Sequence, residues 1–178
     1  LAGMFQRRDL FVVGVGCALL SYFLVYPVLW HANPFYLFAY GSAFTFCMYF
    51  VLDFILADNE HYRKIPMEKK FYVLSNIIKA AVLMSLSFST SAAMYRIIMY
   101  DEWENVLVKN AGSIYSMTDF VSLFVVKRMA RTTIAHHVLV CVFNFWSVFN
   151  DYQVENICRA IVVYAIFSSF AYLVNFLL

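Results

Sequence analysis

Long apolar runs separated by short polar segments are the dominant pattern along this chain. A helix that spans a membrane needs about 20 mainly apolar residues. Six segments reach or approach that length, namely Leu10–Trp30, Phe35–Ala57, Phe71–Met99, Val106–Val126, Thr132–Phe149 and Cys158–Leu178. Strands of a transmembrane barrel would instead alternate apolar and polar residues over about ten positions, and we find no such alternation. The pattern therefore predicts an all-α, polytopic transmembrane bundle of about six spans.

The polar segments between these runs indicate how the helices are connected. Residues 31–34 (His-Ala-Asn-Pro) form a short turn, so the first two spans are expected to make a helical hairpin. One long polar loop, residues 58–70, follows this hairpin. We therefore divide the chain into a hairpin with its basic loop, residues 1–68, and a four-span region, residues 69–178. We expect the two parts to form one structural unit.

Among the connectors between predicted spans, only alternate ones carry basic residues. They are Arg7 and Arg8 before the first span, Arg63, Lys64, Lys69 and Lys70 in the long loop, and Lys127, Arg128 and Arg131 between the fourth and fifth spans. The remaining connectors are neutral or acidic. Because basic loops stay on the cytoplasmic or matrix side of a membrane, both termini are predicted to lie on that side. This alternation independently supports an even number of spans.

The composition of the chain also indicates a membrane environment. The chain has 178 residues, of which 63% are hydrophobic and only 13% charged, whereas a soluble domain carries about 25% charged residues. Its solvent is therefore expected to be lipid. We find no phosphate-binding glycine loop and no nucleic-acid signature, so we expect no cofactor and no nucleic-acid partner.

Ionisable side chains inside the predicted spans are the main functional candidates, because such groups are costly in lipid and usually face the bundle interior. At 1.5 Å of rise per residue, Lys79 and Asp119 lie roughly 10 Å from the inner boundary, and His136, His137 and Asp53 lie roughly 6–8 Å from it. Residues from four spans thus share nearly one level. We predict an intramembrane polar cluster of Asp53, Lys79, Asp119, His136 and His137.

Two interpretations of this cluster remain open. In a catalytic one, Asp119 orients a histidine that acts as a general base, as in acyl transfer, while Lys79 keeps Asp119 ionised. In a structural one, Lys79 and Asp119 form an ion pair and each histidine bonds to a neighbouring helix. We predict no metal site, because adjacent histidines project about 100° apart whereas helical chelation uses residues three or four apart.

The segment after the acidic connector resembles a known family. Ser113-Ile-Tyr115, then Asp119, the basic pair Lys127-Arg128 and the paired His136-His137 are similar to the core of the TLC-domain family. That family includes ceramide synthases and translocating-chain-associated membrane proteins. The resemblance covers about residues 69–178. It implies that Asp119, His136 and His137 correspond to residues that ceramide synthases use for acyl transfer from acyl-CoA.

Departures from the family pattern bear on activity. Lys79 stands where a histidine is usual, the segment around Ser168-Ser169 lacks the usual glutamate and proline, and the last span lacks the further aspartates of ceramide synthases. We therefore expect a non-catalytic lipid-binding protein or an accessory subunit of a larger membrane complex. The alternative is a lipid acyltransferase that uses Asp119 and His136/His137. A proton relay or transporter is a third hypothesis, without a repeat or broken helix in its favour.

The expected partners are membrane lipids and other membrane subunits. The resemblance implies the endoplasmic reticulum, whereas a compact accessory chain that begins with Leu1 also suits the mitochondrial inner membrane. The residues do not choose between the two compartments.

Overall fold

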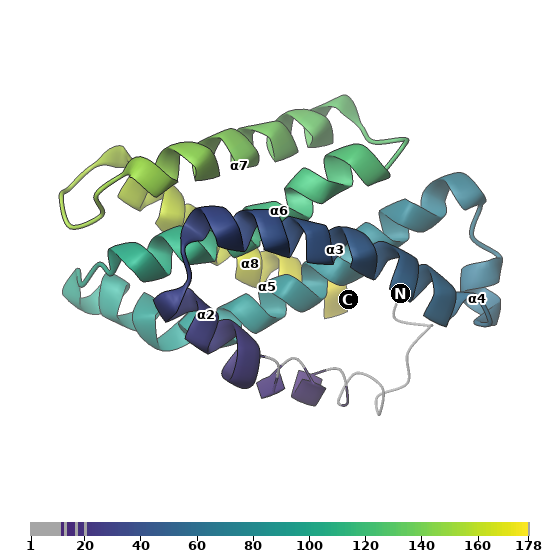
Figure 1. Cartoon of the computed structure of the whole chain (residues 1–178), viewed down its shortest axis with the longest axis horizontal. Coiled ribbons are helices and arrows are strands. Elements are labelled where there is room, and N and C mark those ends of the chain that lie inside the picture. Colours follow the sequence, from purple (N-terminus) through teal and green to yellow (C-terminus); the bar gives the residue numbers. More distant parts are fainter. Residues whose placement is uncertain (1–11, 13, 17, 20, 178) are drawn as a thin grey trace.

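A computed structural model describes residues 12, 14–16, 18–19 and 21–177, with side chains described as far as Ser169. Within this part of the chain every regular element is a helix (Figure 1). The elements are a π-helical turn η1 (Ser21–Val25), α2 (Tyr26–His31), α3 (Pro34–Leu56), α4 (Glu60–Arg63), α5 (Met67–Tyr100), α6 (Asn105–Val125), α7 (Arg131–Phe149) and α8 (Ile157–Leu177). The predicted all-helical class is confirmed.

The second helix of the hairpin, α3, begins at a cap formed by the residue before it. The Asn33 side chain accepts hydrogen bonds from the backbone N–H groups of Phe35 and Tyr36, at 3.0 and 3.5 Å. Pro34 occupies the first turn of α3, where its missing N–H costs nothing. The turn between α2 and α3 is therefore as short as the sequence predicts.

The long polar loop is shorter than the sequence indicates. Asn59 caps the short helix α4 by accepting from the backbone N–H groups of His61 and Tyr62, at 3.0 and 3.1 Å. Pro66 directly precedes α5, which begins at Met67 rather than at Phe71. Charged residues in the first turn of a helix carry no apolar signal, so hydrophobic patterning alone placed this boundary four residues too late. Arg7 and Arg8 lie outside the described residues.

Helix α6 is the centre of the bundle, with α2, α3, α5 and α7 packed around it (Figure 1). Its buried polar residues outnumber those of any other described helix; they are Asn110, Ser113, Ser116, Thr118, Asp119 and Ser122. Several of these hydroxyls bond to backbone carbonyls of the same helix. Polar groups are thus gathered at the protected core, while large apolar side chains face outward on α3.

Four described helices are long and apolar enough to cross a membrane, by length and composition. They are Gly14–His31, which includes η1 and α2, and α3, α5 and α7. Helix α6 is not among them because of its polar residues, and α8 is represented by the apolar stretch Ile157–Ser169, the part of this helix whose side chains the structure describes. The molecule therefore has the composition of a membrane-associated helical bundle.

The two ends of the bundle differ in chemistry. At one end, Arg128 in the α6–α7 connection forms an ion pair with Glu68 at the start of α5, at 2.7 Å. At the other end, Arg159 of α8 pairs with Asp101 after α5, at 3.0 Å. The Arg128 contact brings the two basic connectors to the same end of the molecule, where α4 also lies (Figure 1).

Candidate functional site

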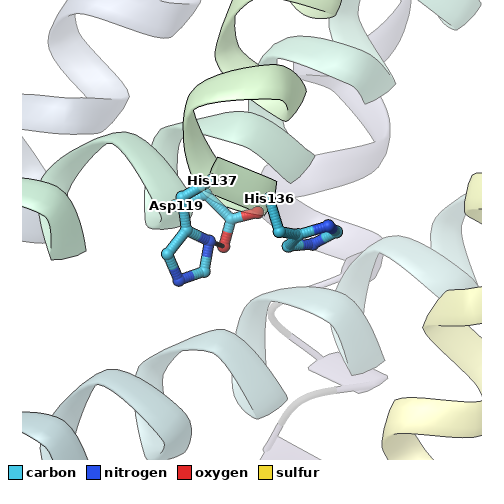
Figure 2. Close-up of side chains that lie close together, drawn as sticks. All are labelled: Asp119, His136 and His137. Carbon is cyan, nitrogen blue, oxygen red and sulfur yellow. Dashed lines mark ion pairs between the residues drawn. The ribbon is translucent and has the colours of Figure 1, made fainter. Parts of the chain in front are cut away.

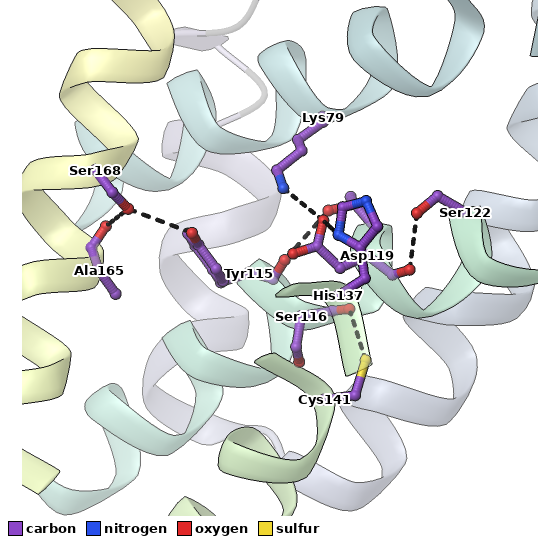
Figure 3. Close-up of polar contacts among 10 residues, drawn as sticks. Lys79, Tyr115, Ser116, Asp119, Ser122, His137, Cys141, Ala165 and Ser168 are labelled. Carbon is purple, nitrogen blue, oxygen red and sulfur yellow. Dashed lines mark hydrogen bonds and ion pairs between the residues drawn. The ribbon is translucent and has the colours of Figure 1, made fainter. Parts of the chain in front are cut away.

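Three helices bring Lys79, Asp119 and His137 together in the core (Figure 3). Asp119 of α6 has a fully buried side chain, and its Oδ1 lies 2.5 Å from the Lys79 Nζ of α5. The same oxygen lies 2.9 Å from the His137 Nδ1 of α7. A buried carboxylate needs such a partner, because removing an unpaired charge from water is very costly. The predicted convergence of these three residues is therefore present.

The aspartate is incompletely hydrogen-bonded. Its Oδ2 has no hydrogen-bond partner among the described residues. The His137 Nδ1 is within ion-pair distance of Oδ1, but the imidazole is not aligned for a well-formed hydrogen bond. The Lys79 ammonium thus makes the closer contact with this carboxylate, and His137 completes its surroundings.

His136 turns away from its neighbour (Figure 2). The two imidazole centroids are 5.6 Å apart with a tilt of 55° between the rings. His137 is buried against Asp119, whereas His136 is exposed and lines a cleft between helices. Consecutive residues of a helix point in different directions, so one histidine faces the buried aspartate and the other faces the cleft.

Asp53 does not join the other predicted cluster residues. Its Oδ1 accepts a hydrogen bond of 2.5 Å from the Tyr62 hydroxyl of α4. Tyr62 is fully buried, and burial followed by the hydrogen bond to Asp53 raises the pKa of this phenol. Depth along a helix gives the level of a side chain but not its direction around the bundle, so the sequence grouped Asp53 with residues that it does not contact.

A cleft of about 360 Å³ lies among α5, α6, α7 and α8. Helix α8 packs mainly on α5, and α7 packs mainly on α6, which leaves space between α7 and α8. The walls are largely apolar; representative lining residues are Leu86, Met94, Val108, Leu139, Val140 and Phe143. The sequence did not predict this cleft, because it results from how the helices pair.

A few polar groups interrupt the apolar walls. The Tyr115 hydroxyl lies 3.3 Å from the Ser168 hydroxyl across the cleft (Figure 3). Ser147 accepts a hydrogen bond of 2.7 Å from Tyr152, and Asn144 also lines the walls. Asn144 and Ser147 carry no charge, so the ionisable residues of the spans do not point to them. Their amide and hydroxyl groups within an apolar run are the sequence signal that marks them.

The geometry also bears on metal binding. Asp119, His136 and His137 offer ligand atoms that lie within 4.8 Å of one another. However, the Lys79 ammonium is 2.5 Å from the same carboxylate, and its positive charge opposes a cation at that position. We therefore assign no metal role to these residues.

Known proteins provide no further guide to this site. No protein-family model matches the chain, and neither does any curated protein or solved structure. Functional assignment consequently depends on the residues and the cleft themselves.

Proposed function

We propose that this chain is a six-span membrane protein that binds the acyl chain of a membrane lipid in the α7–α8 cleft. We further propose that it acts without catalysis, as a lipid-binding or accessory subunit of a larger membrane complex with a TLC-like bundle. The observation that carries this proposal is the apolar cleft of about 360 Å³. That volume falls within the range of about 300–1,000 Å³ typical of small-molecule sites.

The position of the cleft favours a lipid chain over a water-soluble ligand. Two of the four helices that line it, α5 and α7, have the length and composition of membrane spans, and α8 adds the apolar stretch Ile157–Ser169. Because α7 and α8 pack on different neighbours, a chain could enter from the surrounding lipid between them. Along α7, the wall extends from His136 to Ser147, which corresponds to about 16 Å of helix. An elongated apolar ligand matches this shape.

Six spans are supported by the arrangement of α6 and α8. Each contains 21 residues, which corresponds to about 30 Å of helix and matches the hydrocarbon thickness of a bilayer. The polar residues of α6 are tolerable in a membrane because surrounding helices cover them. Six spans place both termini, with the basic connectors, on the cytoplasmic or matrix side.

The separation of the two histidines favours binding over catalysis. A general base for acyl transfer must reach the reacting group and is commonly oriented by a third residue. Here the histidine beside Asp119 is His137, whereas the histidine on the cleft wall is His136. The ion-paired residues therefore stabilise the bundle, while His136 contacts the ligand.

An acyltransferase is the second candidate, because His136 does line the cleft only one residue from His137. In that case, purified chain would transfer an acyl group from acyl-CoA to an amine or alcohol lipid, and His136→Ala would abolish transfer. We expect no transfer from the chain alone.

The accessory role and the compartment are tested by purification. Gentle detergent extraction, a native gel and mass spectrometry of co-migrating chains would identify the assembly. We expect migration with other membrane subunits, and their identity would distinguish the endoplasmic reticulum from the mitochondrial inner membrane. Migration as an isolated chain would contradict the accessory role.

Lipid binding is tested by photolabelling in vesicles with a fatty acid that carries a diazirine on its chain. We expect labelled peptides from α7 and α8, at cleft residues such as Leu139 and Ile161. Phe44 and Phe54 of α3 are exposed but do not line the cleft. Labelling of α3 equal to that of α7 and α8 would indicate contact with bulk lipid and would overturn the proposal.

A further inference from the structure

An asparagine side chain lies in the apolar wall of the cleft without a partner for its carbonyl oxygen. Asn144 of α7 is only 7% exposed and lines the cleft. Its buried Oδ1 has no hydrogen-bond partner among the described residues. A buried polar group of this kind costs the free energy of a lost hydrogen bond unless something else supplies that bond. Asn144 is therefore a candidate ligand contact.

The backbone opposite Asn144 leaves room for this amide. A Cβ atom at Gly112 of α6 would lie only 2.9 Å from the Asn144 Oδ1, so any larger residue would displace the amide. The neighbouring Ser147 differs from Asn144, because it already accepts a hydrogen bond from Tyr152. Among the described residues that line the cleft, only Asn144 thus has a buried polar atom without a hydrogen-bond partner.

The position of Asn144 along the cleft indicates which part of a lipid it would meet. His136 is exposed, so we place the headgroup of the ligand at that end of the cleft. Asn144 follows eight residues later on α7, about 12 Å along the helix axis. Asn144 would therefore meet the chain of the lipid, well away from its headgroup.

Between these two positions the wall of α7 offers only apolar side chains to the cleft. They are Leu139, Val140 and Phe143. An unsubstituted chain would satisfy this stretch but would leave the amide unpaired. A hydroxyl on the chain would pair with it, because a hydroxyl both donates and accepts and so suits either orientation of a side-chain amide.

We propose that the cleft selects a lipid whose acyl chain carries a hydroxyl group remote from the headgroup, and that Asn144 binds this hydroxyl. This inference rests on the proposed function, since it names the chemical class of the lipid in the same cleft.

The test compares stearate with a hydroxystearate whose hydroxyl lies near the middle of the chain. Each is titrated against the purified full chain in lipid nanodiscs, by displacement of a fluorescent fatty acid. We expect wild-type chain to bind the hydroxylated probe about tenfold more tightly, the effect of one net hydrogen bond. Asn144→Leu, which is similar in size, should bind stearate but lose the preference.

Two further variants keep the result interpretable. Gly112→Ala, whose added Cβ displaces the amide, should also reduce the preference. Phe143→Leu alters the apolar wall alone and should weaken both probes by a similar factor while keeping their ratio.

The outcomes separate the two proposals. Equal binding of both probes by wild-type chain, or a preference that survives in Asn144→Leu, would overturn the inference and leave lipid binding intact. Failure of wild-type chain to bind either probe would overturn the proposed function, and the inference with it.

Discussion

At the scale of single residues, the core is organised around one buried carboxylate. Asp119 is surrounded by Lys79 and His137, which come from two other helices. These three residues could be predicted from the sequence, because ionisable side chains stand out in apolar runs and all three lie at similar depth in their predicted spans. Asn144 could not be predicted in this way, because an uncharged amide in a span is common and its lack of a partner is visible only in the folded chain.

The ion pair leads to a stability prediction. Lys79→Met leaves the buried Asp119 carboxylate without its closest charge partner, and breaking a buried pair in this way costs about 3–5 kcal/mol. The double variant Lys79→Met/Asp119→Asn removes both charges and should recover most of that loss. Denaturant titration of the detergent-solubilised variants measures both effects. A Lys79→Met variant as stable as wild type would show that the pair does not hold the bundle together.

At the scale of elements, the chain ends its longest helix with a turn that joins distant segments. Asp101, which follows α5, has φ of 54° and accepts hydrogen bonds from the Trp103 indole at 2.6 Å and from Arg159 of α8 at 3.0 Å. The sequence placed this connector correctly to within a residue or two, because Asp, Glu and Asn interrupt the apolar pattern there. It did not indicate the contact with α8, which depends on tertiary packing.

This turn is predicted to be sensitive to pH. The hydrogen bond from Trp103, and then the charge of Arg159, lower the pKa of Asp101. A lowered folded-state pKa stabilises the fold above the unfolded value of about 3.9, and the contribution is lost as the pH falls through the folded-state pKa. We expect Asp101→Asn, which tolerates the left-handed backbone, to melt below wild type at neutral pH.

The control for this prediction is the same comparison at acidic pH. The difference in melting temperature between wild type and Asp101→Asn should shrink toward zero as the pH falls through the lowered folded-state pKa of Asp101, because the wild-type carboxyl is then protonated too. A difference that stays constant from neutral to acidic pH would contradict an electrostatic role for Asp101.

At the scale of the whole molecule, one ion pair brings two distant connections to the same end of the bundle. Arg128 in the α6–α7 connection pairs with Glu68 at the start of α5, while the orientation of the bundle in a membrane stays a prediction from the charge pattern. The cleft could not be predicted from the sequence. The periodicity of apolar residues shows which face of a helix is buried, but not which helices become neighbours. The distribution of helix contacts, with α8 on α5 and α7 on α6, creates the cleft.

The predicted orientation can be measured with single cysteines in a chain whose four native cysteines are replaced by alanine. Asn59→Cys and Met129→Cys lie in the two basic connectors, and Glu102→Cys and Val154→Cys lie in the acidic ones. In sealed vesicles, a membrane-impermeant thiol reagent should label the first two from one side and the other two from the opposite side. Labelling of Asn59→Cys and Met129→Cys from different sides would contradict the six-span arrangement.

Native mass spectrometry of the gently extracted chain tests the central claim, lipid binding in the cleft, most directly. Val140 lines the cleft, whereas Val142 is 57% exposed and does not line it, so Val140→Trp and Val142→Trp form a matched pair. We predict a retained acyl lipid on wild type and on Val142→Trp, and its loss from Val140→Trp. Wild-type chain without bound lipid, or equal lipid on both variants, would contradict the account.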